Sequence, residues 1–287
     1  FMVYPCYLCS ATNYSKLPGS VRDNASLLIL ECQNCGLVQL SSLAHLKEGH
    51  YENSGMHGQD PEPMEVWERN TAEDDQRRFN MLQSLLINQR VIDFGCGNGG
   101  FLKRAKLLAA EVTGIELEDR VREHLSDQIQ IFSELGALRG VSSFDLITAF
   151  HVVEHLSDPR GILREFKKYL APDGRIVIEV PSSSDSLLTL YESEPFQHFT
   201  YWSQHLYLFN AKTLKTLVQQ SGLKVVSIQQ YQRYPLSNHL YWLSRGKPGG
   251  HKFWSFLDSP ILQQAYADTL ARIGQCDTLI AHLELCD

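Results

Sequence analysis

The chain of 287 residues carries 43% apolar and 21% charged residues and a net charge of -7. This composition is ordinary for a globular protein with room for one large domain and a smaller module. The acidic balance, without a long run of Lys and Arg, argues against a general nucleic-acid binder. Every apolar stretch is shorter than the roughly 18 residues that cross a bilayer, and the start FMVYPCYLCS does not resemble a secretory signal. We therefore expect a cytoplasmic protein without a membrane span.

Two C-x2-C pairs stand near the N-terminus, Cys6 with Cys9 and Cys32 with Cys35. Turn-forming residues and one alternating apolar run, LLILE, lie between them, as in a small β ribbon. Each pair presents two thiolates to one ion, and two pairs complete the tetrahedral shell of a structural zinc ion. The spacing predicts a zinc ribbon over residues 1–46; four unrelated buried cysteines are the alternative.

The next segment, 47–88, is predicted to be a polar linker followed by a helical lead-in that starts near residue 63. Short apolar strands then alternate with amphipathic helices over 89–232, which is typical of a parallel sheet with helices on both faces. Strands are expected at 90–94, 111–116, 129–132, 144–150, 175–180 and in LKVVSIQQY after Gly222. Helices are expected at 99–109, 118–126, 159–170 and 211–221.

The tail, 233–287, is predicted to form an extension of a strand and a helix. The strand is placed in YPLSNHLYWLSR, and the helix carries an apolar stripe from Leu262 to Leu283. This stripe indicates core packing, with a homodimer contact as the alternative. Four polar residues of the tail are interpreted as solvated, or else as contacts to a phosphate group: His239, Arg245, Lys247 and His251.

The stretch VIDFGCGNGG, residues 91–100, joins a predicted strand to a predicted helix through a glycine-rich turn. Such a turn lets the backbone approach a nucleotide, and its glycines fit both a dinucleotide site and an S-adenosylmethionine site. Asp93 would repel a pyrophosphate but suits the cationic amino group of a methionine moiety. Glu116, at the end of the next strand, is placed to accept ribose hydroxyls of either cofactor.

The fourth strand runs into FHVVEHLSDP, which a dinucleotide fold does not call for. The ordered series VIDFGCGNGG, GIELE, FDLITAFHVVEHLSDP and DGRIVIEVP resembles class I S-adenosylmethionine-dependent methyltransferases over residues 89–232. The resemblance implies a Rossmann-like sheet and S-adenosylmethionine as cofactor. It implies these cofactor-binding residues: Asp93, Gly95, Cys96, Gly97, Gly99, Glu116, Leu117, Phe150 and His151.

A ribbon ending in C-x2-C-G-L-V before such a domain resembles bacterial methyltransferases of deoxysugar and surface-polysaccharide pathways. That resemblance implies a sugar or glycan acceptor, often nucleotide-linked. The best-known members methylate carbon and carry a large further C-terminal domain, which the roughly 55 residues after the sheet do not match. O-methylation is therefore slightly favoured over C-methylation.

Methyl transfer needs a base for the proton of the acceptor. The segment EPFQHFTYWSQHLYLFNAKTL follows the fifth strand and supplies His198, Tyr201 and His205. Similar family members carry Glu-His here, whereas this chain has Gln204-His205. We expect His198 or His205 to be the base, with capping of the next helix as the structural alternative. Glu154 and His155 form a second candidate pair, which alternatively braces its loop.

Three other functions remain open from the sequence. An RNA methyltransferase would use the ribbon to bind its substrate, but the acidic balance disfavours it. A cofactor-binding protein without catalysis would bind S-adenosylmethionine without turnover. A dehydrogenase would bind a nicotinamide cofactor instead.

Overall fold

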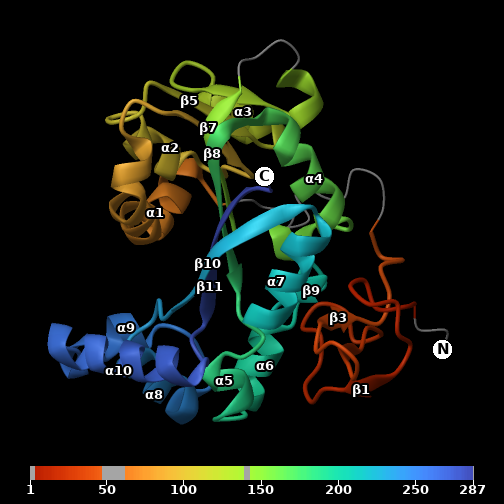
Figure 1. Ribbon diagram of the computed structural model, residues 1–287. Coiled ribbons are helices and arrows are strands. Elements are labelled where there is room, and N and C mark those ends of the chain that lie inside the picture. Colours follow the sequence, from red (N-terminus) through yellow and green to blue (C-terminus); the bar gives the residue numbers. More distant parts are fainter. Residues whose placement is uncertain (1–3, 47–61, 139–142, 287) are drawn as a thin grey trace.

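The computed structural model describes residues 4–46, 62–138 and 143–286 and contains two β-sheets. The larger sheet runs through the middle of the molecule, and the N-terminal segment lies beside its lower half (Figure 1). The predicted linker at 47–61 falls outside the described residues. Among the residues described, no helix is both long and apolar enough to cross a membrane.

The seven-stranded sheet has the order β10-β11-β8-β7-β4-β5-β6. Its strands are β4 (Arg90–Phe94), β5 (Glu111–Ile115), β6 (Gln130–Phe132), β7 (Phe144–Phe150), β8 (Leu170–Pro181), β10 (Leu223–Tyr231) and β11 (Thr278–Leu285). Strands β4 to β8 pair in parallel, and β11 runs antiparallel to both of its neighbours. Because β4 has β5 on one side and β7 on the other, the strand order reverses there and opens a crevice at the carboxyl ends.

Helices cover both faces of this sheet, with α1 and α2 on one side and α4 and α7 on the other (Figure 1). The bounds are α1 (Met64–Leu86), α2 (Gly100–Ala105), α3 (Asp119–Leu125), α4 (Pro159–Tyr169), α5 (Ser186–Thr189), α6 (Glu194–Thr200) and α7 (Ala211–Gln220). Short 3₁₀ helices η1 (Leu135–Leu138) and η2 (Val153–His155) follow β6 and β7. The expected α/β architecture and its helices are thus present, although α2 ends earlier than predicted.

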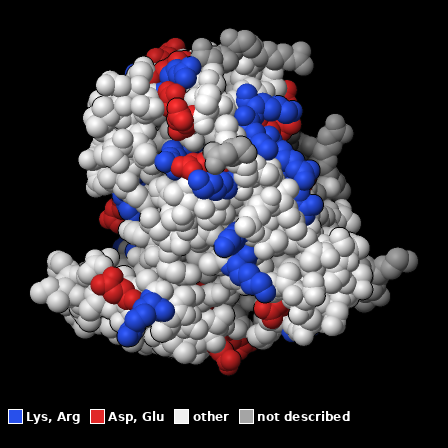
Figure 2. All heavy atoms as spheres, in the orientation of Figure 1, with Lys and Arg blue, Asp and Glu red and all other residues white. Residues whose placement is uncertain are grey.

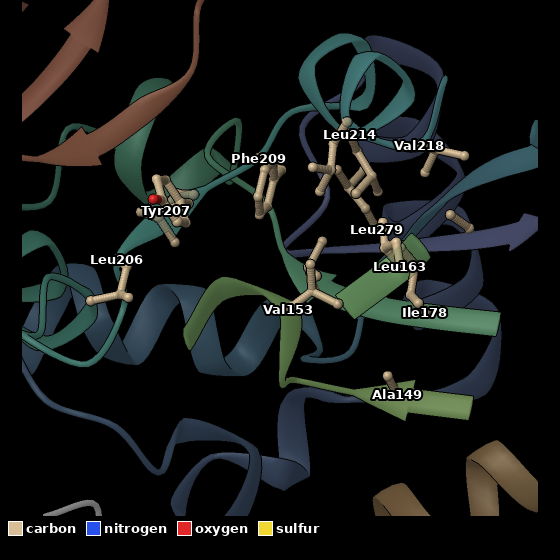
Figure 3. Close-up of a cluster of buried hydrophobic side chains, with 14 of the residues drawn as sticks. Ala149, Val153, Leu163, Ile178, Leu206, Tyr207, Phe209, Leu214, Val218 and Leu279 are labelled. Atoms are coloured by element: carbon tan, nitrogen blue, oxygen red, sulfur yellow. The ribbon is translucent and has the colours of Figure 1, made fainter. Parts of the chain in front are cut away.

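Buried apolar side chains fill the layer between the sheet and α4 and α7. Leu163 of α4 and Leu214 of α7 lie near Ile178 of β8 and Leu279 of β11 (Figure 3). All four are fully buried. The same cluster continues into the N-terminal segment, so one core holds both parts together.

The smaller sheet contains β1 (Tyr14–Lys16), β2 (Ile29–Cys32), β3 (Val38–Leu40) and β9 (Tyr207–Leu208), all antiparallel. Its fourth strand comes from far along the chain: Tyr207 pairs with Gln39, and Leu208 with Val38. Strands β1, β2 and β3 thus form a β-meander in the segment where a zinc ribbon is predicted. Through β9, this small sheet pairs with the segment in which the candidate bases are expected.

The tail differs from its prediction in two places. The expected strand is helix α8 (Leu236–Arg245), because its buried side chains recur with a helical period. The expected long helix ends at α10 (Pro260–Ile273), where Gly274 adopts a left-handed φ of 74°. Residues beyond it form β11, whose nearly continuous burial hides the period that separates a strand from a helix. Short α9 (Gly250–Phe253) and η3 (Ser255–Leu257) lie between α8 and α10.

A buried ionic network holds α1 against the sheet. The Glu179 carboxylate on β8 is fully buried and accepts two hydrogen bonds from Arg77, at 2.9 and 3.0 Å, and one from Arg78 at 2.9 Å. Arg77 also pairs with Asp74, which in turn binds Arg233 beyond β10. Burial raises the pKa of Glu179, but the neighbouring cations outweigh it and hold that pKa well below its usual range.

The substitution Glu179→Gln should lower the free energy of unfolding by about 3–5 kcal/mol near neutral pH, because it leaves buried guanidinium groups without their carboxylate. Since the folded pKa is depressed, this contribution is complete above the unfolded value of 4.5 and is lost as the pH falls below it. Urea unfolding at several pH values measures the difference, which should shrink on acidification.

Glu165→Gln is the matched control, because Glu165 pairs with Lys168 on the exposed face of α4. Its effect should stay below about 0.5 kcal/mol. Equal effects of the two substitutions would contradict a structural role for the buried network.

Candidate functional site

A cavity of about 420 Å³ opens at the carboxyl ends of β4, β5 and β7. Its size suits a cofactor or small ligand. Its lining includes eight of the nine predicted cofactor residues: Asp93, Gly95, Cys96, Gly97, Glu116, Leu117, Phe150 and His151. The ninth, Gly99, is the N-cap of α2 and is absent from the described lining.

The glycine-rich turn leaves little room for side chains at Gly95 and Gly97. Gly95 and Gly97 have φ values of 72° and 51°, where most residues are strained. A Cβ at Gly95 would lie 2.5 Å from Val152 Cγ2, and one at Gly97 would lie 3.2 Å from the Trp67 ring. The backbone here therefore forms a cradle that a bound ligand can approach closely.

Two carboxylates flank this cradle. Glu116 accepts hydrogen bonds from the backbone N–H groups of Gly97, at 2.9 Å, and Glu118, at 3.0 Å. Asp93 is buried and accepts a 2.7 Å hydrogen bond from Thr148 Oγ1. Burial raises the pKa of Asp93 to about 7, so a nearby cation would favour its ionised form. This donor set fits a methionine ammonium group and a ribose, as the sequence predicts.

Helix α1 and the segment after β10 supply cavity residues that the sequence analysis missed. They include Trp67, Thr71, Asp74, Arg78 and Arg233. The guanidinium of Arg78 lies 4.7 Å above the Phe150 ring and faces the cavity. The pattern of α1 in sequence indicates a helix but not which face meets the cofactor. Arg233 lies outside every recognised motif.

Three candidate catalytic residues form one cluster, of which only His155 belongs to the described cavity lining. Ligand-type atoms of Glu154, His155 and His205 lie within 4.8 Å of one another, and His155 lines the cavity itself. The segment around His205 is held beside η2 because Leu206 N donates to the Glu154 carbonyl oxygen at 2.9 Å. The Glu154 and His155 pair and His205, expected from separate motifs, thus form one cluster, whose atom spacing would also suit a divalent cation.

Backbone contacts fix the orientation of both imidazoles. His155 Nδ1 lies 2.8 Å from the Gln204 carbonyl oxygen, and His205 Nδ1 lies 3.0 Å from that of Thr200. Each Nδ1–H donates to its carbonyl, so each neutral ring carries its lone pair on Nε2. Burial lowers the pKa of His205 to about 4 and also lowers that of His155. Both rings are therefore neutral at pH 7.

Glu154 is fully buried, and its Oε1 lies 3.9 Å from His155 Nε2. Its other oxygen, Oε2, has no hydrogen-bond partner among the described residues. Such a carboxylate favours positive charge on the neighbouring ring. The cluster therefore combines a neutral base with a group that stabilises its protonated form.

His151 has a different environment from His155. Its Nδ1 lies 3.3 Å from Glu154 and its Nε2 lies 3.0 Å from Glu179. Burial lowers the pKa of His151, but these carboxylates outweigh burial and raise it overall. His151 also has a φ of 56°, rare for a residue with a side chain. It is better suited to hold a proton between carboxylates than to remove one.

Two of the predicted catalytic residues lie apart from this cluster. His198 Nδ1 lies 3.1 Å from Ser20 Oγ, and the Tyr201 ring packs near Gly19. Neither belongs to the described cavity lining. The helix after His205 is capped by Asn210 and Thr213 rather than by either histidine.

The four ribbon cysteines converge as expected. Cys6 Sγ lies 3.5 Å from Cys35 Sγ, Cys9 Sγ lies 3.5 Å from Cys32 Sγ, and all four sulfurs lie within 4.8 Å of one another. Tetrahedral zinc with bonds of about 2.3 Å needs sulfurs about 3.8 Å apart. The cluster is compatible with zinc.

Comparison with known proteins identifies the class of enzyme that this fold and cavity define. A family model described as a methyltransferase domain matches residues 58–228, and the chain belongs to that family. It is an S-adenosylmethionine-dependent methyltransferase with the class I, Rossmann-like fold.

Curated relatives resemble part of the chain. The ubiquinone biosynthesis O-methyltransferase of Stutzerimonas stutzeri is 31% identical over 101 residues, which is 32% of this chain and 44% of that protein. The enzyme of the same name from Actinobacillus pleuropneumoniae is 34% identical over 104 residues, 31% of this chain and 44% of that protein. The chain thus spans less than half the length of these relatives.

Solved structures share the fold. A SAM-dependent methyltransferase from Archaeoglobus fulgidus has a TM-score of 0.54 at 16% identity, covering 77% of this chain and 99% of that one. A structure from Haloferax volcanii, solved as a complex with the Trm112 methyltransferase activator, has a TM-score of 0.51 at 13% identity, covering 78% and 96%. At these identities the likeness concerns the fold alone.

Gly97→Val should weaken S-adenosylmethionine binding by roughly 100-fold or more. A β-branched residue is strained at a φ of 51°, and its side chain would enter the space beside Trp67. Isothermal titration calorimetry measures the affinity. Gly136→Ala is the control, because a Cβ there meets only the Glu134 side chain, at an ordinary 3.5 Å. Unchanged binding by Gly97→Val would contradict the placement of the cofactor in this cradle.

Proposed function

We propose that the chain is an O-methyltransferase that acts on a hydroxyl group of a small acceptor. The observation that carries this proposal is the cluster of Glu154, His155 and His205, of which His155 lines the cofactor cavity. A hydroxyl group requires a base when it is methylated, and a neutral imidazole beside a buried carboxylate meets that requirement. The O-methyltransferase names of the partial relatives support the same atom type.

Bound S-adenosylmethionine supplies an electrophilic methyl group. The cradle of Gly95 and Gly97 would hold its nucleoside end, Glu116 the ribose, and Asp93 the ammonium group. These contacts fix the donor at the carboxyl ends of the strands. Positioning of this kind provides much of the rate in a reaction whose electrophile is already activated.

His155 takes the acceptor proton at Nε2 as the hydroxyl oxygen is methylated. Its Nδ1–H bond to the Gln204 carbonyl places the basic lone pair on Nε2. Glu154 stabilises the imidazolium that results, and His205 packs against His155 with ring centroids 5.0 Å apart. His205 is thus a positioning residue rather than the base expected from its motif.

The acceptor end of the cavity carries both polar and apolar groups. His151, Arg233 and Asp74 supply charge, and Val152 and Leu156 supply apolar contact. This mixture suits a ring with polar substituents, such as a sugar or a phenol. The sugar expected from the ribbon resemblance and the phenolic alternative are separated by experiment below.

The ribbon is proposed to hold a structural zinc ion. Cys6, Cys9, Cys32 and Cys35 supply four soft ligands and leave no open position for chemistry. The ion would stiffen the meander that pairs with β9, two residues beyond His205. Its role is therefore to support the catalytic segment rather than to contact substrate.

His155→Asn should lower kcat by roughly 100-fold or more, with cofactor affinity little changed. Asparagine can still donate to the Gln204 carbonyl, so the loss reports the missing base. His205→Asn should have a smaller effect. Because burial holds the pKa of the base His155 below its usual 6.5, wild-type kcat/KM should stay level as the pH falls past 6.5 and decline only at lower pH.

His198→Asn is the matched control, since His198 lies in the same stretch but contacts Ser20 and lies apart from the cluster of Glu154, His155 and His205. It should leave kcat unchanged. A larger loss for His198→Asn or His205→Asn than for His155→Asn would assign the base to the more sensitive residue.

Incubation with S-adenosylmethionine bearing a deuterated methyl group should label a hydroxyl of a nucleotide sugar or of a phenol. Mass spectrometry of both panels identifies the acceptor class, and fragmentation separates O-methyl from C-methyl products. A C-methyl product would overturn O-methylation. Absence of any product despite tight cofactor binding would favour the non-catalytic alternative over the proposed function.

A further inference from the structure

The segment between β10 and β11 carries a projecting apolar surface that methyl transfer does not use. We define the apolar tip as residues 250–262, which comprise α9, η3 and the start of α10. Phe253, Phe256 and Ile261 are 66%, 77% and 84% exposed there. Figure 1 shows α9 and α10 projecting at the lower left, and Figure 2 shows the outer end of this projection as largely uncharged surface. Large apolar side chains gathered at one exposed end mark an interaction site.

The apolar tip packs against helix α8. Phe253 stacks on Tyr241 of α8 with ring centroids 5.7 Å apart, and Ser237 Oγ donates to Asp258 at 2.6 Å. A Cβ at Gly250 would lie 2.5 Å from the Ser237 carbonyl oxygen, so α9 packs directly on α8. The apolar side chains are therefore presented by a packed scaffold rather than by a frayed end.

Basic residues accompany these apolar groups. Arg245, Lys247 and Lys252 lie at or just before the tip, against the single acidic residue Asp258 between positions 245 and 262. Phe253 lies against Gly249, so the turn bearing Lys247 borders the exposed rings. Within the described parts of the chain, none of the three cations makes an ion pair. The chain as a whole has a charge of -7, so this end is locally opposite in sign.

We propose that the apolar tip inserts into the surface of a membrane containing anionic lipids. Exposed aromatic and aliphatic side chains enter the interface, and flanking cations remain at the phosphate headgroups. A second copy fits less well, because a closed symmetric dimer would bring the same cationic rim against itself. The tip would thereby hold the cavity near the membrane, since Arg233 lines the cavity and the adjacent Tyr234 contacts His251 with ring centroids 5.3 Å apart.

Vesicle co-sedimentation of the full chain tests this inference without reference to catalysis. Vesicles of phosphatidylcholine alone are compared with vesicles of phosphatidylcholine mixed with phosphatidylglycerol. The protein should bind the anionic vesicles, and binding should weaken as salt is added. The paired change Phe256→Ser and Ile261→Ser should lower the partition coefficient about tenfold or more.

Two matched controls distinguish vesicle binding by the apolar tip from nonspecific binding by other exposed residues. Leu107→Ser removes a side chain that is 76% exposed after α2 and should leave binding unchanged. Lys247→Glu with Lys252→Glu should weaken binding to anionic vesicles, whereas Lys215→Glu on α7 should not. Far-UV circular dichroism checks that each variant is folded.

The membrane inference is overturned if the chain binds neither vesicle, or if the Phe256 and Ile261 double variant binds as well as the wild type. Sedimentation equilibrium supplies the remaining outcome. A dimer that this double variant dissociates would assign the tip to a second copy of the chain and overturn the membrane assignment.

Discussion

The buried carboxylate of Glu179 constrains the arrangement of the whole site. A charge in this position needs cationic partners, and the chain supplies them from α1 through Arg77 and Arg78. Helix α1 is thereby fixed against the ends of β7 and β8, where its Trp67 and Thr71 form a wall of the cofactor cavity. The same carboxylate contacts His151, and through Asp74 the network reaches Arg233 beyond β10. One buried carboxylate therefore links helix α1, the segment after β10 and the sheet around the cavity.

Features that depend on short sequence patterns, such as the glycine-rich turn and the cysteine pairs, could be predicted from sequence. The glycine-rich turn needs particular backbone angles, and Gly95 and Gly97 adopt them. Glu116 follows its strand by a fixed spacing, so its place at the cavity also follows from the pattern. The four cysteines converge because two short turns can each present two thiols to one point.

Long-range contacts could not be predicted in the same way. Arg233 lies after an edge strand, and its place in the cavity depends on pairing with Asp74, which is far away in sequence. The choice among His155, His198 and His205 depends on the path of residues 201–207 past η2. The sequence of strand β11 predicts a helix instead, because burial on both faces removes the alternation that marks a strand.

The ribbon is joined by direct contacts to residues 205–208, the segment of the proposed positioning residue His205. Strand β9 completes the ribbon sheet, and His205 precedes it by two residues. The backbone of Leu206 is bonded to Glu154, and the Tyr207 hydroxyl donates to the Ser157 carbonyl at 3.3 Å. Displacement of the ribbon would therefore alter the orientation of the imidazoles, although no ribbon side chain belongs to the described cavity lining.

The antiparallel strand β11 also affects the order in which the molecule can assemble during synthesis. It follows every other described element in the chain, yet it lies between β8 and β10. Until residues 278–285 leave the ribosome, β8 presents an unpaired edge and β10 has no strand to join. The nascent chain thus carries an exposed apolar edge from the synthesis of β8 until residues 278–285 emerge, and closure of the sheet coincides with the arrival of β11.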